Sequence, residues 1–178
     1  MKTRRAVFLD RDGVINRAYV RKGKPYPPAG LAEIEVLPGV AQALTEFREA
    51  GFMLIVVTNQ PDVARGKTPR KVVEEINNYL AARLAIDEFR VCFHDNSDAC
   101  ECRKPLPGAL LAAAKIHDID LVKSYMIGDR WRDTEAGQKA GCKTIFIDYG
   151  YAEKQPESVD YRVKSLLEAA QIILGENK

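Results

Sequence analysis

The chain contains little cysteine, histidine or tryptophan: four Cys, two His and one Trp among 178 residues. Long apolar runs are missing as well, because the longest, Phe52–Val57, is far shorter than the roughly 20 residues that a membrane-spanning helix needs. The apolar run near the amino end, Ala6–Leu9, is too short for the core of a secretory signal. These absences argue against a membrane protein and against an exported, disulfide-rich one, so we expect a cytoplasmic location.

An excess of charge of one sign is also missing. With 27 Lys and Arg against 25 Asp and Glu, the net charge of +2 is too small to indicate binding to nucleic acid or to an anionic membrane. The sequence shows no biased tract and no internal repeat. At 178 residues, 46% of them hydrophobic, the chain can bury the core of one domain spanning residues 1–178, and we expect a monomer.

Short apolar runs rich in β-branched residues alternate with helix-like segments along the chain. The expected strands are 6–10, 52–59, 89–93, 124–129 and 144–148, and the expected helices are 39–50, 69–85, 108–117, 133–140 and 164–174. Several of these strands lack polar alternation, which is typical of parallel strands buried on both faces. The pattern predicts an α/β fold: a doubly wound, mostly parallel, Rossmann-like sheet with helices on both faces.

The scarce cysteine and histidine gather in one loop, residues 92–104. Its spacing is Cys92-x-His94-x5-Cys100-x-Cys102. Three thiols and one imidazole are a ligand set of closed, structural zinc sites, and the polar residues between them offer little apolar side chain to hold the loop together. Reduced structural thiols and a disulfide are the alternatives. We favour zinc, because the ligand set is complete within one loop.

Polar residues stand at the ends of the expected strands. In a doubly wound sheet, ligands bind beyond the carboxyl ends of the strands. The residues near those ends, together with the lysine that leaves the Cys/His loop, are Asp10, Asp12, Thr58, Asn59, Asp129, Asp133 and Lys104. Any one of them could merely cap a turn or finish a strand. Together, on successive strand ends, they indicate one site.

The carboxylates of this set suit metal-assisted phosphate chemistry. Crowded carboxylates tolerate one another when a hard divalent cation lies between them, and Mg²⁺ keeps room for water and a substrate phosphate. An aspartate beside such an ion can attack phosphorus, giving an aspartyl-phosphate that water hydrolyses. A second carboxyl group two residues on can protonate the leaving oxygen and then take a proton from the attacking water. Thr58 and Lys104 would stabilise the charge on the phosphoryl oxygens.

Four segments carry a resemblance to a known family: FLDRDGVIN, VVTNQ, CRKP and MIGDRWRDTEAG. In this order they resemble the four motifs of the haloacid dehalogenase (HAD) superfamily of phosphohydrolases. The resemblance implies Asp10 as nucleophile and Asp12 as general acid and base, with Thr58 and Lys104 as phosphoryl stabilisers. It also implies a magnesium cofactor with three ligands, Asp10, Asp12 and Asp129. Asp133 is either a weaker metal partner or a brace for Lys104.

The segments between these motifs are too short for the cap domain that many superfamily members insert. A capless chain with this Cys/His loop is similar to the histidinol-phosphatase-related branch, and most closely to its heptose 1,7-bisphosphate phosphatases. In that group the zinc loop and a flap, here residues 17–37, shape the substrate pocket. The resemblance implies a phosphomonoesterase of carbohydrate metabolism, with removal of the 7-phosphate from heptose 1,7-bisphosphate as the expected reaction.

Two alternatives stay open at this point. A histidinol-phosphate phosphatase would share every motif named above. A phosphate-binding module without catalysis is the alternative from another class, and the intact Asp10 and Asp12 argue against it. The expected ligand in each case is a small phosphorylated metabolite. The residues expected to contact it are Asn59, Arg103, Arg130, Arg17 and Tyr19.

The chain departs from the pattern of the group at Phe93, Asp95 and Pro61-Asp62, and these positions concern the substrate more than the chemistry. Two other residues indicate structure rather than function: Cys142 is expected in the core, and His117 at the surface near a helix end. Trp131 either covers the mouth of the pocket or packs.

Overall fold

The structure, a computed structural model, describes residues 3–177. Six strands form the central sheet: β1 (Arg5–Leu9), β4 (Phe52–Asn59), β5 (Glu88–Cys92), β6 (Tyr125–Gly128), β7 (Lys143–Ile147) and β8 (Tyr161–Val163). Their order across the sheet is β5-β4-β1-β6-β7-β8, and every neighbouring pair is parallel. The expected doubly wound parallel sheet is confirmed. Because β1 lies between β4 and β6, the direction of winding reverses beside it, and such a switch point opens a crevice at the carboxyl edge.

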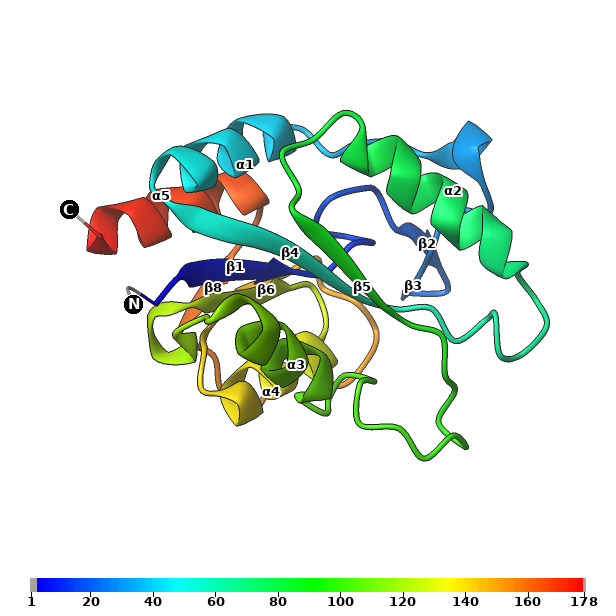
Figure 1. Cartoon of the computed structure of the whole chain (residues 1–178). Coiled ribbons are helices and arrows are strands. Elements are labelled where there is room, and N and C mark those ends of the chain that lie inside the picture. Colours follow the sequence, from blue (N-terminus) through cyan, green and yellow to red (C-terminus); the bar gives the residue numbers. More distant parts are fainter. Residues whose placement is uncertain (1–2, 178) are drawn as a thin grey trace.

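Helices cover both faces of this sheet (Figure 1). One face carries α1 (Val40–Glu49), α2 (Arg70–Ala81) and α5 (Leu166–Glu176), and the other carries α3 (Gly108–His117) and α4 (Trp131–Ala140). A short 3₁₀ helix, η2 (Leu121–Lys123), precedes β6. No helix among residues 3–177 is both long enough and apolar enough to cross a membrane.

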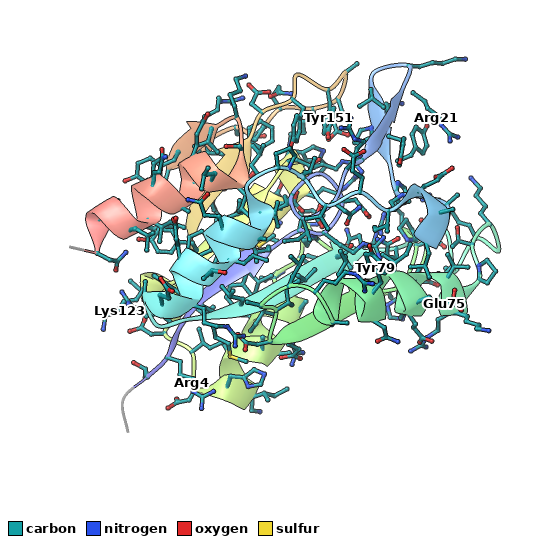
Figure 2. The ribbon with its side chains drawn as sticks, turned by 90° about the horizontal axis from the view of Figure 1, so that it is seen from above. Arg4, Arg21, Glu75, Tyr79, Lys123 and Tyr151 are labelled. Atoms are coloured by element: carbon teal, nitrogen blue, oxygen red, sulfur yellow. The ribbon has the colours of Figure 1, made fainter. Side chains whose placement is uncertain are left out.

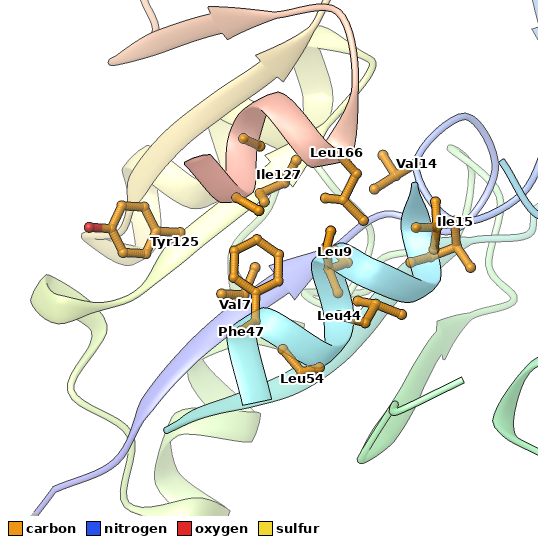
Figure 3. Close-up of a cluster of buried hydrophobic side chains, with 14 of the residues drawn as sticks. Val7, Leu9, Val14, Ile15, Leu44, Phe47, Leu54, Tyr125, Ile127 and Leu166 are labelled. Carbon is orange, nitrogen blue, oxygen red and sulfur yellow. The ribbon is translucent and has the colours of Figure 1, made fainter. Parts of the chain in front are cut away.

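Two hydrophobic clusters lie on the two sides of the sheet. In β1, Val7 and Leu9 join the cluster under α1 and α5, while Phe8 joins the cluster under α3 and α4. Figure 3 shows the first cluster, in which Phe47 of α1 lies above Val7. Because alternate side chains of the central strands are buried on opposite faces, these strands need apolar residues at every position. That explains their lack of polar alternation.

The ends of three helices differ from expectation. α5 begins at Leu166, where Ser165 Oγ accepts a hydrogen bond from the Glu168 amide and so caps the helix. It runs to Glu176, two residues beyond the expected end at residue 174. α4 begins two residues earlier than expected, and α2 ends at Ala81, four residues earlier. The strand β8 was not expected, because three residues are too few to show a period.

The flap is more regular than its composition indicates. It contains a hairpin of β2 (Tyr19–Arg21) and β3 (Lys24–Tyr26), followed by the 3₁₀ helix η1 (Leu31–Glu33). The two turn residues, Lys22 and Gly23, both have positive φ, as a tight hairpin turn requires. The carbonyl oxygen of Gly23 accepts a 2.8 Å hydrogen bond from the amide of Ala152, so the tip of the flap is attached to the loop that follows β7.

Candidate active site

A cavity of about 400 Å³ opens at the carboxyl ends of β1, β4 and β6. These strands are neighbours in the sheet although 42 residues or more lie between them in the chain, so residues at their ends come together. The predicted site residues that line this cavity are Asp10, Asp12, Thr58, Asn59, Arg103, Lys104, Asp129, Arg130 and Asp133. The predicted convergence on one edge is therefore present.

Lys104 is almost fully buried in the wall of the cavity, with 1% of its surface exposed. Its Nζ donates to Asp10 Oδ1 at 2.8 Å and to Asp133 Oδ1 at 2.8 Å, and also to the carbonyl oxygen of Val57 at 2.6 Å. Burial acts to lower the pKa of Lys104, but the carboxylates of Asp10 and Asp133 outweigh it and raise the pKa. The lysine stays charged, and Asp133 braces it.

The backbone of Lys104 is fixed as well. Asn59, at the end of β4, accepts from the Lys104 amide with Oδ1 at 3.1 Å and donates to the Lys104 carbonyl with Nδ2 at 2.9 Å. Both polar atoms of the Asn59 side chain therefore tie the end of the Cys/His loop to the sheet. A substrate contact by Asn59 stays a prediction, and positioning of Lys104 is the role that its hydrogen bonds describe.

Three buried carboxylates form a compact acidic cluster: oxygens of Asp10, Asp129 and Asp133 all lie within 4.8 Å of one another. Burial, reinforced by the charge of Asp133 and opposed by Lys104, raises the pKa of Asp10 to about 6. Burial and the charges of Asp10 and Asp133 likewise raise the pKa of Asp129 well above its ordinary value. Oδ1 of Asp129 is buried and has no hydrogen-bond partner among the described residues.

This cluster fits a magnesium ion. A buried carboxylate oxygen without a partner is rare and needs an explanation, and a bound cation supplies one. A divalent cation would also relieve the repulsion between the carboxylates, and an all-oxygen set is what Mg²⁺ prefers.

Asp12 lies beside the acidic cluster but uses its carboxylate differently. Oδ1 accepts from Asn16 Nδ2 at 3.0 Å and from Arg11 Nε at 3.1 Å, and Oδ2 accepts from Gln60 Nε2 at 2.8 Å. The same Gln60 amide donates to Thr58 Oγ1 at 3.0 Å. Sequence reasoning missed Gln60, which connects the predicted acid and base to the predicted phosphoryl stabiliser. Magnesium ligation by Asp12 stays a prediction.

The four residues of the Cys/His loop come together as a second cluster. The Sγ of Cys92 lies 3.6 Å from Nδ1 of His94 and 3.8 Å from Sγ of Cys100, and Sγ of Cys102 lies 3.2 Å from Sγ of Cys92. A tetrahedral zinc site with bonds of about 2.3 Å to sulfur and about 2.0 Å to nitrogen has edges of about 3.5 to 3.8 Å. The Cys92–His94 and Cys92–Cys100 distances match these edges, and the Cys92–Cys102 distance is shorter; the four residues together are compatible with zinc. All four cysteines are free thiols in the structure, which contradicts the disulfide alternative.

Side chains around this loop hold it against the cavity. Arg65, in the segment after β4, forms an ion pair with Asp95 at 2.5 Å. Arg103 donates from Nε to Asn96 Oδ1 at 2.9 Å and from Nη1 to the His94 carbonyl at 3.3 Å. The guanidinium of Arg103 is thus positioned by its own loop while it lines the cavity.

The other predicted substrate contacts are divided between two places. Arg130 lines the catalytic cavity and forms a 2.5 Å ion pair with Glu153. Arg17 pairs with Glu35 at 2.7 Å and lines a separate cavity of about 420 Å³. Tyr19 donates to the Glu33 carbonyl at 2.6 Å and lines neither cavity. A substrate role for Arg17 and Tyr19 stays a prediction.

Further basic residues line the cavity, and two of them, Lys67 and Arg132, were not predicted from the sequence. Besides Arg103, three basic residues line it without a carboxylate partner among residues 3–177: Lys24, Lys67 and Arg132. Burial, with the charges of Arg130 and Arg103, lowers the pKa of Arg132. Lys24 comes from the flap, whose cations the sequence shows directly, whereas Lys67 and Arg132 come from the segment after β4 and from α4, where nothing in the local sequence marks them.

The remaining sequence expectations concern structure. Cys142 is buried in the core as expected, and burial raises its pKa to about 12. His117 is partly exposed and pairs with Glu88 at 2.5 Å. Trp131 does not line the catalytic cavity. Arg132 Cζ and Lys154 Nζ lie over its ring, 4.8 and 4.6 Å from the ring centroid.

The positions of Asp10, Lys104 and Asp12 suit the cleavage of a phosphate ester. A carboxylate held by a charged lysine at the end of β1 can attack phosphorus, and a second carboxylate two residues on can move the proton that ester cleavage requires. The fold and the site therefore define the class as a phosphohydrolase.

Comparison with known proteins agrees with this class. A family model described as HAD-hydrolase-like matches residues 101–169. The D-glycero-beta-D-manno-heptose-1,7-bisphosphate 7-phosphatase of Escherichia coli (strain K12) is 33% identical over an alignment of 190 residues, gaps included. The alignment covers 97% of this chain and 95% of that protein. The enzyme of the same name from Helicobacter pylori is 34% identical over 166 residues, which cover 89% of this chain and 91% of that protein.

A solved structure extends the similarity to three dimensions. The D,D-heptose 1,7-bisphosphate phosphatase of B. bronchiseptica, complexed with magnesium and phosphate, matches with a TM-score of 0.81 and 29% identity, covering 97% of this chain and 99% of that one. The chain belongs to the HAD superfamily of hydrolases. It is a phosphatase of that superfamily.

Proposed function

We propose that this chain is a magnesium-dependent phosphomonoesterase that removes the 7-phosphate from heptose 1,7-bisphosphate through an aspartyl-phosphate on Asp10. The observation that carries the proposal is the carboxylate of Asp10, which lines the cavity while Lys104 holds its Oδ1 at 2.8 Å. The curated relatives, similar over most of the chain, are named for this reaction, which supports the choice of substrate.

In the first half-reaction, a carboxylate oxygen of Asp10 attacks the phosphorus and the bond from phosphorus to the sugar oxygen breaks. Asp12, oriented by Gln60 and Asn16, gives its proton to that leaving oxygen. All three protons of Lys104 Nζ have acceptors in the protein, so the lysine acts through its charge and its hold on Asp10. The Thr58 hydroxyl, which already accepts from Gln60, can donate to a phosphoryl oxygen.

In the second half-reaction, Asp12 takes a proton from a water molecule that attacks the phosphorus of the aspartyl-phosphate. The bond from phosphorus to the Asp10 oxygen breaks, and inorganic phosphate and the free carboxylate are formed. The proton that Asp12 gave to the sugar is thereby replaced, so the enzyme returns to its starting state.

Two metals complete the proposal. A magnesium ion with the carboxylates of Asp10 and Asp129 as its main ligands, and with Asp12 and Asp133 alongside, would offset the negative charge that gathers between these carboxylates and the phosphoryl group. Zinc bound by Cys92, His94, Cys100 and Cys102 would be structural: it would hold the loop that carries Arg103 and Lys104. The sulfur–sulfur and sulfur–nitrogen distances support this second site.

The cations that have no carboxylate partner among residues 3–177 support a substrate with a second anionic group. Arg103 and Arg132 lie on the Cys/His loop and on α4, and Lys67 and Lys24 lie on the segment after β4 and on the flap. Like charges around one cavity repel each other, and a bound phosphate would relieve that repulsion. We therefore propose that these residues bind the phosphate that is retained, with Arg103 making bidentate hydrogen bonds.

A phosphate-release assay tests the function. The purified chain with Mg²⁺ is offered heptose 1,7-bisphosphate, the corresponding 7-phosphate, histidinol phosphate and an aryl phosphate, and kcat/KM is measured for each. We expect the bisphosphate to be the best substrate. A preference for histidinol phosphate would replace the proposed substrate, and absence of turnover on all four, with Mg²⁺ bound, would contradict catalysis itself.

We also propose that the chain acts in the cytoplasm as a monomer. The free thiols support a reducing compartment, where zinc-binding cysteines stay reduced. Light scattering after size-exclusion chromatography checks the second point, with a mass near 19.9 kDa expected.

A further inference from the structure

The loop that follows β7 contacts the active site through two tyrosines that the proposed chemistry does not use. The hydroxyl of Tyr151 donates a 2.8 Å hydrogen bond to Oδ2 of Asp129, and Tyr151 has only 9% of its surface exposed. The hydroxyl of Tyr149 donates a 3.0 Å hydrogen bond to the carbonyl oxygen of Gly13. The two rings stack with their centroids 5.6 Å apart. Figure 2 shows Tyr151 at the same end of the molecule as the flap residue Arg21.

The hydrogen bond from Tyr151 fixes the orientation of the Asp129 carboxylate. One oxygen of this carboxylate is held by Tyr151, and the other, Oδ1, is buried without a hydrogen-bond partner among residues 3–177. It is Asp129 that joins Asp10 and Asp133 in the acidic cluster. The tyrosine therefore fixes the plane of a carboxylate whose second oxygen is left for a cation.

The bond to Gly13 holds the turn that packs against the same carboxylate oxygen, Oδ2 of Asp129. Gly13 follows Asp12 in the turn after β1 and has a φ of 87°, which favours glycine. A Cβ atom there would lie 2.0 Å from Asp129 Oδ2, so the turn passes directly against that oxygen. Tyr149 keeps the Gly13 carbonyl in place, and the stacked rings make the two contacts parts of one unit.

The same loop is attached to the flap, because the amide of Ala152 donates to the carbonyl oxygen of Gly23 at the hairpin tip. Residues 149–152 thus connect three parts of the chain that lie far apart in sequence: the turn after β1, the flap and Asp129. Neither tyrosine contacts the cavity in which the proposed reaction takes place. They contact instead the carboxylate of Asp129 and the turn at Gly13.

We propose that Tyr151 is a positioning residue for the cation site, which sets the orientation of the Asp129 carboxylate, and that Tyr149 supports it by holding the turn at Gly13. Groups that hydrogen-bond to a metal ligand from outside orient that ligand, and their removal costs about ten- to a hundredfold in metal affinity or activity. The proposal concerns the affinity for Mg²⁺ and does not depend on which phosphate ester is the substrate.

The test is Tyr151→Phe, which removes one hydroxyl and keeps the ring that stacks on Tyr149. Mg²⁺ binding is measured by titration calorimetry on the metal-stripped protein without substrate. We expect the Kd for Mg²⁺ to rise about ten- to a hundredfold. Hydrolysis of an aryl phosphate should need correspondingly more Mg²⁺ for half-maximal rate, with kcat at saturating Mg²⁺ changed much less.

Two further variants separate this role from a structural one. Tyr161→Phe removes a hydroxyl that bonds Glu176, away from the cavity, and should leave the Kd for Mg²⁺ unchanged. Tyr149→Phe should raise the Kd by less than Tyr151→Phe, because its bond reaches Asp129 only through Gly13. If Tyr151→Phe lowers the melting temperature but binds Mg²⁺ as the unchanged protein does, the positioning role is refuted.

Discussion

Two clusters of potential metal ligands lie at the carboxyl edge of the sheet, and they are built in opposite ways. The acidic cluster takes carboxylates from the end of β1, the end of β6 and the first turn of α4, and all of them are buried. The Cys/His cluster takes its ligands from the end of β5 and one loop, and only Cys92 is buried. The first is assembled by the fold, whereas the second is contained in eleven consecutive residues, 92–102.

This difference assigns different work to the two clusters. The carboxylates are crowded and all three line the cavity, and the pKa values of Asp10 and Asp129 are raised, which are properties of a reacting centre. The Cys/His cluster lies directly before Arg103 and Lys104 in the chain, and Arg103 donates to the His94 carbonyl. This cluster therefore supports the segment that carries both residues. We therefore expect the acidic cluster to control turnover, and the Cys/His loop to control what is bound.

The sharpest test of this division is Asp10→Asn. An amide cannot serve as the nucleophile, so kcat should fall on the order of a thousandfold or more, whichever substrate is used. The zinc content and the melting temperature should stay close to those of the unchanged protein, because the substitution lies outside the Cys/His cluster. Stopped-flow or steady-state phosphate release measures kcat, elemental analysis measures the zinc content, and thermal unfolding measures the melting temperature. Activity near the original level would show that another group attacks phosphorus.

Chelation should distinguish the two clusters by exchange. Mild treatment with EDTA is expected to abolish turnover, and added Mg²⁺ to restore it, because Mg²⁺ binds a few carboxylates and keeps exchangeable water. Zinc should stay bound through this treatment, since closed thiolate sites hold the ion tightly. Metal analysis before and after treatment measures both. Protein that is purified with reduced thiols and contains no zinc would contradict the structural zinc site.

Asp12→Asn separates proton transfer from metal binding within the acidic region. We expect kcat to fall by about a hundred- to ten-thousandfold, the usual contribution of a general acid and base. Because the Asp12 carboxylate is bound by Asn16, Arg11 and Gln60 and lies outside the compact cluster, Mg²⁺ affinity should change little. Calorimetry with Mg²⁺ provides the comparison. A large loss of Mg²⁺ affinity would instead make the Asp12 carboxylate an essential ligand.

Arg103→Ala tests the support side of the comparison and should have the smallest effect. We expect kcat/KM for the sugar bisphosphate to fall about ten- to a hundredfold, as for one charged hydrogen-bonding partner, and activity on an aryl phosphate to fall much less. Arg132→Ala should act in the same direction, since it lines the same cavity without a carboxylate partner among the described residues.

Arg83→Ala is the matched control, because this arginine lies after α2, over the ring of Tyr79, and does not line the cavity. It should leave kcat/KM for both substrates unchanged. Equal losses on the bisphosphate and the aryl phosphate in Arg103→Ala would move Arg103 from recognition into the catalytic machinery.

Most of the fold was predictable, because burial on both faces leaves a direct mark on a strand. The apolar run of β4, for example, identifies a central parallel strand, and the glycines and caps near helix ends place several helices. β8 and the β2–β3 hairpin escaped, since strands of three partly exposed residues carry no such pattern.

The sequence by itself predicted the chemistry: which residues would attack phosphorus and move protons, and which four could bind zinc, because each set is a short motif whose residue types have few other uses together. Only the tertiary structure decided what surrounds them. Tyr151 reaches Asp129 across 22 residues, and Gln60 reaches Asp12 across 48. Lys67 and Arg132 meet at one cavity from different elements. Such contacts depend on the crossovers that bring distant segments to one edge of the sheet, and no local pattern encodes them.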